Sequence, residues 1–208
     1  MKNVDEIFKQ KADYYDEALR LFGEFRKRAY GTKLELLEWF SDFSIFTLLG
    51  AYDLWIILID YQKAIKVYQR TYYARQAALI CFELLSDNSQ QIGNEYIKLL
   101  IEKVDEENIS KKAIQIRKDF NKLRSDNESK FKDIRDYTIA HRDHNISNQL
   151  KIINSLDMDW IMEFSMDYLN KIEELHSLFN QFINKINIDG KDLGKDEFLK
   201  KYTYIKNA

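Results

Sequence analysis

The 208 residues of this chain include no proline, and this feature most restricts the folds available to it. Proline and glycine are the usual interrupters of regular structure, and the chain has only six glycines. Apolar residues recur at three- and four-residue steps nearly throughout, and no long segment alternates with period two. The sequence therefore predicts an all-α fold of about six helices around one core.

Polar and glycine-containing breaks divide the chain into the predicted helices. The spacing predicts helices over 3–29, 32–60, 63–85, 92–104, 110–143 and 157–186, the fifth with a break left open at 125–127. Three segments are predicted to be non-helical: 86–89, 105–108 and 144–154. Gly31 ends the first helix, and Thr32 with Glu35 has the spacing of a capping box for the second. We expect one helical domain over 1–188 and a lysine-rich tail over 189–208, docked or loose.

Composition is that of an ordinary globular protein, with 45% hydrophobic and 32% charged residues. Acids among the first six residues argue against a secretion signal, and the single Cys81 fits a reducing, cytoplasmic location. Glu38, Asp42 and Asp53 interrupt the apolar stretch 34–59, so we expect the central buried helix here rather than a membrane span. No membrane partner is expected.

Charge is unevenly distributed along the sequence. The net charge of −2 argues against a general nucleic-acid coat protein. Residues 61–82 nevertheless carry four Lys or Arg and no acid, and residues 110–144 carry ten Lys or Arg against six acids. Two basic segments on a mildly acidic chain suggest a local site for an anion.

Residues 135–143, Arg-Asp-Tyr-Thr-Ile-Ala-His-Arg-Asp, give the most specific signal. At about 100° per residue, one helical face presents a hydroxyl, an imidazole and two guanidiniums beside apolar residues. These polar residues are Arg135, Thr138, His141 and Arg142. Arginine binds phosphate, and histidine exchanges protons near neutral pH, which are functions that RNA cleavage requires. One copy offers few groups for two proton transfers, so catalysis would need a dimer; a core or interface histidine is the alternative.

The string R-D-x-x-x-A-H-x-D at Arg135 to Asp143 resembles the R-x(4–6)-H motif of the HEPN superfamily, in particular its abortive-infection, AbiU-like branch. The helical organisation, with the motif late in the chain and one long helix after it, is also similar. The specific part of the resemblance covers nine residues, and the helical part covers about 5 to 187.

The resemblance implies an all-α homodimer with both Arg-His pairs in a shared cleft. It further implies a metal-independent endoribonuclease of a bacterial toxin or phage-defence system, with an antitoxin protein as a further partner. By position, Arg135 would bind and polarise the phosphate, His141 would be the acid/base, and Asp136 would orient one of them. Asp143 stands where one branch has a tyrosine that an antitoxin modifies, so that form of control is not expected.

Four tyrosines interleave with basic residues over 61–75. Arg70 and Arg75, with Lys132 of the later segment, are therefore candidate RNA-binding residues beside Arg142 and Thr138. The alternative is a helix with half-buried tyrosines and solvated cations. A non-catalytic module that binds RNA or a protein partner through the same face is the alternative function.

Four acids fall within a ~60° arc of the second predicted helix. They are Glu38, Asp42, Asp53 and Asp60. A solvated or salt-bridging stripe is favoured over a paired-carboxylate site. His141, Asp143 and His144 are metal ligands by type, but no further ligand cluster accompanies them. We expect neither a metal nor a cofactor.

Overall fold

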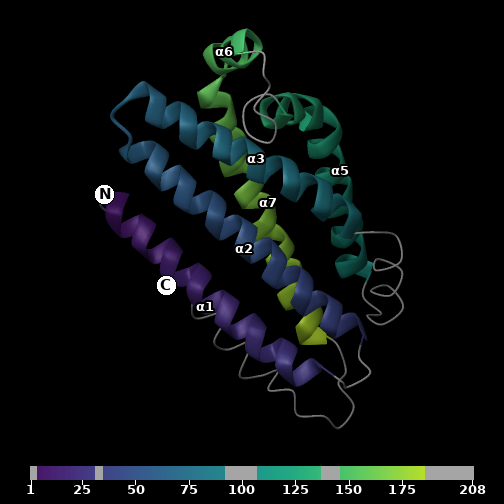
Figure 1. Cartoon of the computed structure of the whole chain (residues 1–208). Helices are drawn as coiled ribbons and strands as arrows, with labels where there is room; N and C mark the ends of the chain where they lie inside the picture. The colour runs from purple at the N-terminus through teal and green to yellow at the C-terminus, as the bar shows by residue number, and fades with distance from the viewer. Residues whose placement is uncertain (1–3, 31–34, 92–106, 137–145, 186–208) are drawn as a thin grey trace. The chain divides into compact units, whose positions relative to one another are not determined.

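The computed structural model describes residues 4–30, 35–91, 107–136 and 146–185 (Figure 1). Within these ranges it has six helices and no strand, which confirms the all-α prediction. The helices are α1 (Val4–Ala29), α2 (Glu35–Lys63), α3 (Val67–Gln91), α5 (Glu107–Arg135), α6 (Ile146–Asn154) and α7 (Met158–Lys185). The predicted helix 92–104, Thr32 of the capping box and the tail 189–208 lie outside the described residues.

Helix α3 corrects the predicted turn at 86–89, because it continues through this polar segment to Gln91. Asn88 is fully buried, and its amide donates a hydrogen bond to the Tyr168 hydroxyl of α7. This tertiary contact satisfies the amide nitrogen of a side chain that favours turns when it is exposed. The local polarity of the segment therefore did not decide its structure.

Two further boundaries differ from the sequence predictions. Helix α5 begins at Glu107 and runs without a break through 125–127, where Asn127 Nδ2 donates to the Leu123 carbonyl at 2.9 Å and Arg124 bonds Glu128. The segment predicted as irregular contains α6, which half-buries Ile152 and Ile153. Burial of these adjacent side chains supports a helix too short to stand out in the sequence pattern.

The chain divides into two compact units. The first comprises 1–52, 91–116 and 172–208, with α1 and parts of α2, α5 and α7. Its core is aromatic: the Phe40 ring stacks on Phe182 with centroids 4.3 Å apart and meets the edge of Phe179 at 4.5 Å. The buried His176 of α7 lies beside Thr47 of α2, with 2.8 Å between Nε2 and the hydroxyl oxygen.

The second unit comprises 53–90 and 117–171, with α3, α6 and the remaining parts of α2, α5 and α7. The side of α3 that is fully buried carries small residues, Ala74, Ala77, Ala78 and Cys81. Small side chains allow close approach of a neighbouring helix, and the Cys81 sulfur lies 3.5 Å from the Ser165 hydroxyl of α7. Phe120 of α5 meets the ring edge of Tyr168 at 5.8 Å.

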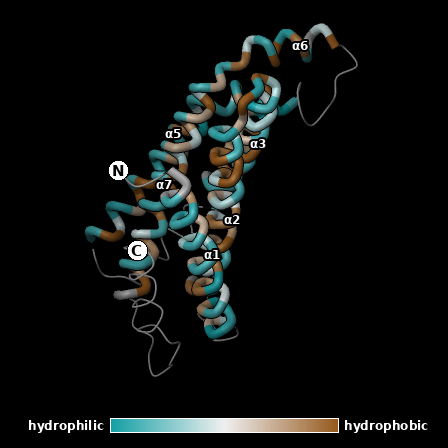
Figure 2. Tube along the Cα trace, turned by 90° about the vertical axis from the view of Figure 1, so that its left-hand side faces the viewer, coloured by the Kyte–Doolittle hydropathy of each residue, from teal (hydrophilic) through white to brown (hydrophobic). Residues whose placement is uncertain are grey.

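Helix α2 has a buried side and an exposed side, both rich in apolar residues, so Figure 2 shows much of its trace as hydrophobic. Leu48 and Leu54 are fully buried, whereas Phe46, Leu49 and Ile56 are at least 37% exposed. By length and composition alone the Leu37–Lys63 segment is apolar enough to cross a membrane, a test that core helices of soluble proteins also pass. The expected cytoplasmic location stays a prediction.

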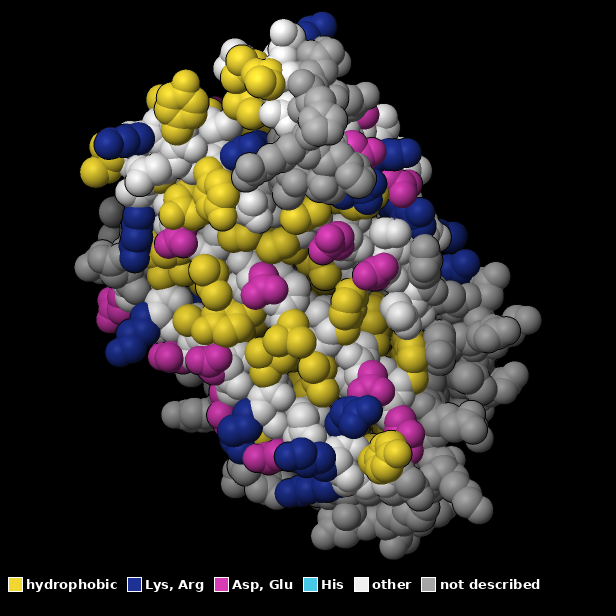
Figure 3. Space-filling view, in the orientation of Figure 1, with side chains coloured by type: hydrophobic (Ala, Val, Ile, Leu, Met, Phe, Trp, Pro, Cys, Tyr) yellow, Lys and Arg dark blue, Asp and Glu magenta, His cyan; other side chains and the backbone are white. Residues whose placement is uncertain are grey.

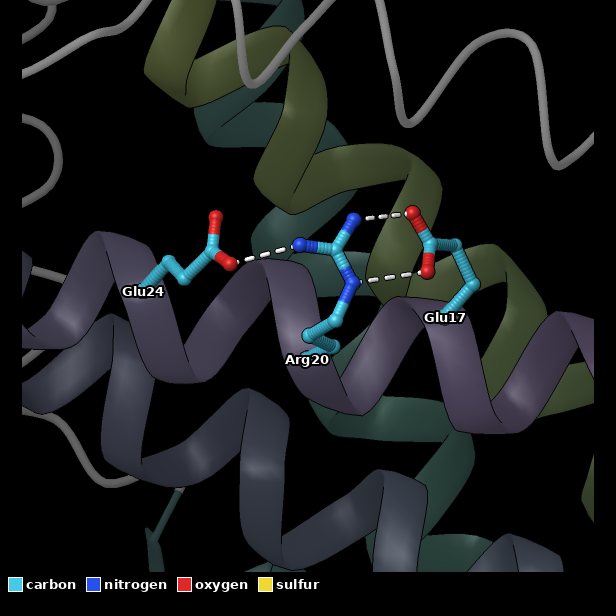
Figure 4. A network of polar contacts seen from close by, with 3 residues as sticks. All are labelled: Glu17, Arg20 and Glu24. Carbon is cyan, nitrogen blue, oxygen red and sulfur yellow. Dashed lines mark hydrogen bonds and ion pairs between the residues drawn. The ribbon is translucent and has the colours of Figure 1, made fainter.

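Helix α1 has an ion-pair network on its exposed side (Figure 4). Arg20 lies between Glu17 and Glu24, three residues before it and four after it, and pairs with both. A hydrogen bond from Arg20 to Glu17 and the charges of both carboxylates raise the pKa of its guanidinium. The three side chains are largely solvated, so they solubilise this side of the helix and contribute little to the free energy of folding.

Candidate functional site

The candidate site begins at the C-terminal end of α5, with Arg135 and Asp136. Arg135 Nε donates to Asp136 Oδ1 at 2.8 Å, and Nη2 lies 2.6 Å from the same oxygen. Both side chains are 29% exposed. The Cζ atom of Arg135 lies over the ring of Phe82 in α3, 4.3 Å from its centroid. The guanidinium is therefore held between a carboxylate and an aromatic face, with part of it open to solvent.

Aromatic packing holds the last turns of α5 in place. Phe131, one turn before Arg135, is fully buried, and its ring lies 4.8 Å from Phe164 and 5.0 Å from Trp160. Lys130 Nζ lies over the outer part of this cluster, 4.7 Å from the Trp160 ring. A buried aromatic anchor of this kind fixes the helix against α7, so the direction in which Arg135 leaves α5 is fixed as well.

Helix α3 also brings Arg75 to this side of the unit. Arg75 and Phe82 are seven residues apart, so they share one side of α3 with a rise of ~10 Å between them. Arg75 is half-buried. Lys132 is exposed on the last turn of α5. Arg75 therefore lies on the side of α3 that carries Phe82, the residue that Arg135 contacts, and Lys132 lies on the last turn of α5 with Arg135.

Arg70 has a different position and a local role. Its Nε donates to the Ala64 carbonyl at 3.0 Å, and its guanidinium lies 5.9 Å from the Tyr61 ring. It therefore stabilises the turn between α2 and α3. Since it precedes Phe82 by twelve residues on α3, it lies ~18 Å along the helix from that ring. The structure does not bring Arg70 to Arg135.

Thr138, His141 and Arg142 lie outside the described residues, as do Asp143 and His144. The described part of the site thus consists of a fixed guanidinium with its carboxylate, immediately before the segment that carries the histidine. Such a guanidinium can bind one phosphate oxygen and withdraw charge from phosphorus. Sequence reasoning missed Phe82 and Trp160, because each contacts a cation that lies on another helix.

In the acidic stripe on α2, Asp42 accepts hydrogen bonds from Arg26 of α1. The pair raises the pKa of the Arg26 guanidinium through that bond and the charge of Asp42. Among the described residues, no group of three or more His, Cys, Asp or Glu is arranged to hold a metal ion. The Arg26 contact is what the salt-bridging interpretation of the stripe predicts for Asp42.

Comparisons of the chain with protein-family models, with curated proteins and with solved structures find no match.

Proposed function

We propose that this chain is a metal-independent endoribonuclease of the HEPN type, acting in a bacterial toxin or phage-defence system. The observation that carries the proposal is the fixed position of Arg135 at the end of α5, where Asp136 and Phe82 hold it. The histidine of the motif follows six residues later. Because this arginine is oriented before the substrate arrives, little free energy is needed to reorganise the site when charge develops on the phosphate.

In the proposed reaction, the 2′-hydroxyl oxygen attacks phosphorus as a base takes its proton. The bond from phosphorus to the 5′ oxygen breaks, and an acid protonates that leaving oxygen. The products are a 2′,3′-cyclic phosphate and a 5′-hydroxyl, so neither water nor an oxidant is consumed. His141 would make one proton transfer and its copy in a second subunit the other. Arg135 would stabilise the phosphorane charge, and Asp136 would orient Arg135.

The experiment compares cleavage of several RNAs by wild type, His141→Ala and Arg135→Ala in the presence of EDTA. We expect His141→Ala to lower the rate by roughly 10²- to 10⁴-fold and Arg135→Ala by roughly 10²-fold or more. Mass spectrometry of the product ends should show cyclic phosphates. Equal rates for wild type and His141→Ala on every RNA would overturn the proposal.

Arg124 provides a matched control for Arg135. It lies on the same helix and bonds Glu128 as Arg135 bonds Asp136. Lysine keeps the charge but loses the planar fork, so Arg135→Lys should lower cleavage sharply, whereas Arg124→Lys should leave it unchanged. Equal losses in both variants would show that α5 is merely destabilised.

The proposal includes a homodimer, since one copy supplies one histidine of the motif for two proton transfers. Sedimentation equilibrium should give twice the chain mass at concentrations where RNA is cleaved. Mixing wild-type chains with an excess of His141→Ala chains should lower the activity per wild-type chain, because a shared site with a single histidine lacks one of the two proton transfers.

The same contacts also favour a second candidate function, a non-catalytic RNA- or protein-binding module. Asp136 compensates the charge of Arg135, and Phe82 covers one face of its guanidinium, as in a structural ion pair. This function predicts that His141→Ala binds RNA normally, while Arg135→Ala weakens binding in a salt-dependent way.

A further inference from the structure

The turn between α2 and α3 carries apolar side chains that are largely exposed. Ile65 is 92% exposed, Val67 69% and Tyr68 84%. Tyr72, one turn further along α3, is 49% exposed. In Figure 3, hydrophobic side chains project at the upper left, where Figure 1 places this turn, and Lys or Arg side chains stand among them. A contiguous group of exposed apolar side chains of this kind indicates a surface that something covers.

The turn is held in one conformation by its own hydrogen bonds. Ala64 is buried, its N–H donates to the Tyr61 carbonyl at 3.2 Å, and its carbonyl accepts the Arg70 bond. On the other side of the turn, the Lys66 N–H donates to Gln69 Oε1 at 3.3 Å. The exposed side chains therefore project from a fixed backbone, which lowers the entropic cost of burying them against a partner.

The charges around these side chains are positive. Residues 61–82 contain no acid, and Lys63 and Lys66, which flank Ile65 in sequence, are exposed. Asp60 immediately precedes this segment in sequence. Asp157 Oδ1 accepts the Trp160 N–H at 3.0 Å, and Asp159 bonds the Tyr61 hydroxyl. Burial, followed by the charge of Asp159, raises the pKa of that hydroxyl.

Helix α6 lies at the same end of this unit (Figure 1). It ends four residues before Met158, whose sulfur accepts a hydrogen bond from Thr71 near the start of α3. Ile146 is 67% exposed and Leu150 52%, one turn apart, with Lys151 beside them. Helix α6 thus adds exposed apolar side chains at this end of the unit.

From this combination we propose that the α2–α3 turn binds the surface of a membrane that contains anionic lipids. Ile65 and Val67 would enter the boundary between headgroups and acyl chains, Tyr68 would lie at headgroup level, and Lys63 and Lys66 would reach anionic headgroups. RNA fits this surface less well, because Ile65 and Val67 offer neither a ring for stacking nor a polar group for a base. The proposed binding is to the membrane surface only. It differs from a membrane-spanning helix over 34–59, which the sequence argued against.

Flotation of the purified full chain with vesicles tests the proposal. The vesicles are phosphatidylcholine alone and phosphatidylcholine mixed with phosphatidylglycerol. We expect binding to the mixed vesicles only, weakened by salt. Lys63→Gln with Lys66→Gln should lower the partition coefficient about 25-fold, at about fivefold per lysine. Ile65→Ser with Val67→Ser should lower it by roughly tenfold or more, since these side chains lose their insertion into the apolar layer.

Matched controls lie on α5, a different helix. Lys118→Gln with Lys122→Gln removes two exposed lysines, and Ile114→Ser removes an isoleucine that is 38% exposed. These variants should bind the mixed vesicles as wild type does. Circular dichroism should show that every variant is folded, because the substituted residues are exposed.

The proposal would be overturned if the wild type did not bind the mixed vesicles. It would also be overturned if the α5 controls lost as much vesicle binding as the turn variants. The proposal would also be overturned if the protein failed to bind vesicles but bound single-stranded RNA through Lys63 and Lys66, as measured by fluorescence anisotropy. If the turn instead joins two copies of the chain, the wild type should not bind vesicles. Its sedimentation mass should then be higher than that of the double variant Ile65→Ser with Val67→Ser. RNA cleavage in solution should be unchanged in the turn variants, so failure here is distinct from failure of the ribonuclease proposal.

Discussion

The Arg135 guanidinium in α5 lies over the ring of Phe82 in α3, with 4.3 Å between Cζ and the ring centroid. We expect Phe82→Leu to lower RNA cleavage by roughly twofold to fivefold, because a cation–π contact of roughly 0.5–1 kcal/mol no longer fixes the arginine. Single-turnover cleavage rates measure this effect. Phe82→Tyr keeps the aromatic face and should keep the activity; a loss in both variants would show that packing, not the ring face, matters.

The Thr47 hydroxyl and Nε2 of His176 are 2.8 Å apart in the core of the first unit. Thr47→Val keeps the side-chain shape but leaves the buried imidazole without this partner. It should lower the free energy of unfolding by about 1–3 kcal/mol, measured by urea denaturation. Ser41 bonds only the Leu37 carbonyl of its own helix, so Ser41→Ala should cost less. An equal cost for both would contradict the contribution of the α2–α7 bond.

Asn88 and Tyr168 form a buried pair in the second unit. Tyr168→Phe removes the acceptor of the Asn88 amide hydrogen and should lower the free energy of unfolding by about 1–3 kcal/mol. Tyr72→Phe, at a half-exposed tyrosine of α3, should change it by less than about 0.5 kcal/mol. We also expect Tyr168→Phe to increase amide hydrogen exchange at the end of α3, because this pair supports the polar segment 86–89. Unchanged exchange there would refute that explanation of the helix.

Burial raises the pKa of the Cys81 thiol from 9.0 to about 12, and burial also raises the pKa of the Tyr168 hydroxyl. In the unfolded chain the thiol loses its proton near its ordinary pKa, whereas in the folded chain it keeps it. The buried thiol therefore makes its full contribution to the free energy of unfolding below about pH 9, and this contribution is lost progressively as pH rises towards 12. Urea denaturation across this range should show the decline, and Cys81→Ala should make it shallower.

The same burial protects Cys81 from thiol reagents. Only the thiolate is an effective nucleophile, so at pH 8 the native protein should react at least roughly a hundredfold more slowly than the urea-unfolded chain. Absorbance of a released aromatic thiolate measures both rates. Fast reaction of the native protein would show that the α3–α7 contact opens readily.

The sequence by itself determined the fold class and most of the helices. The lack of proline and the regular apolar spacing act within each segment, so they are visible without tertiary information. They predicted α1 and α7 to within about one residue at each described end. The sequence also identified Arg135 and Asp136, which are adjacent and form their ion pair locally.

Only the tertiary structure decided the features that depend on a partner from another helix. Asn88 continues α3 through a polar segment because Tyr168 accepts its hydrogen bond, and Phe82 fixes Arg135 because the two helices pack together. Ile65 looked like any other apolar residue in the sequence, and its exposure depends on which side of the turn the remaining helices cover. Local spacing predicts which residues form a helix, but it cannot specify which distant side chain will satisfy, orient or leave exposed each of them.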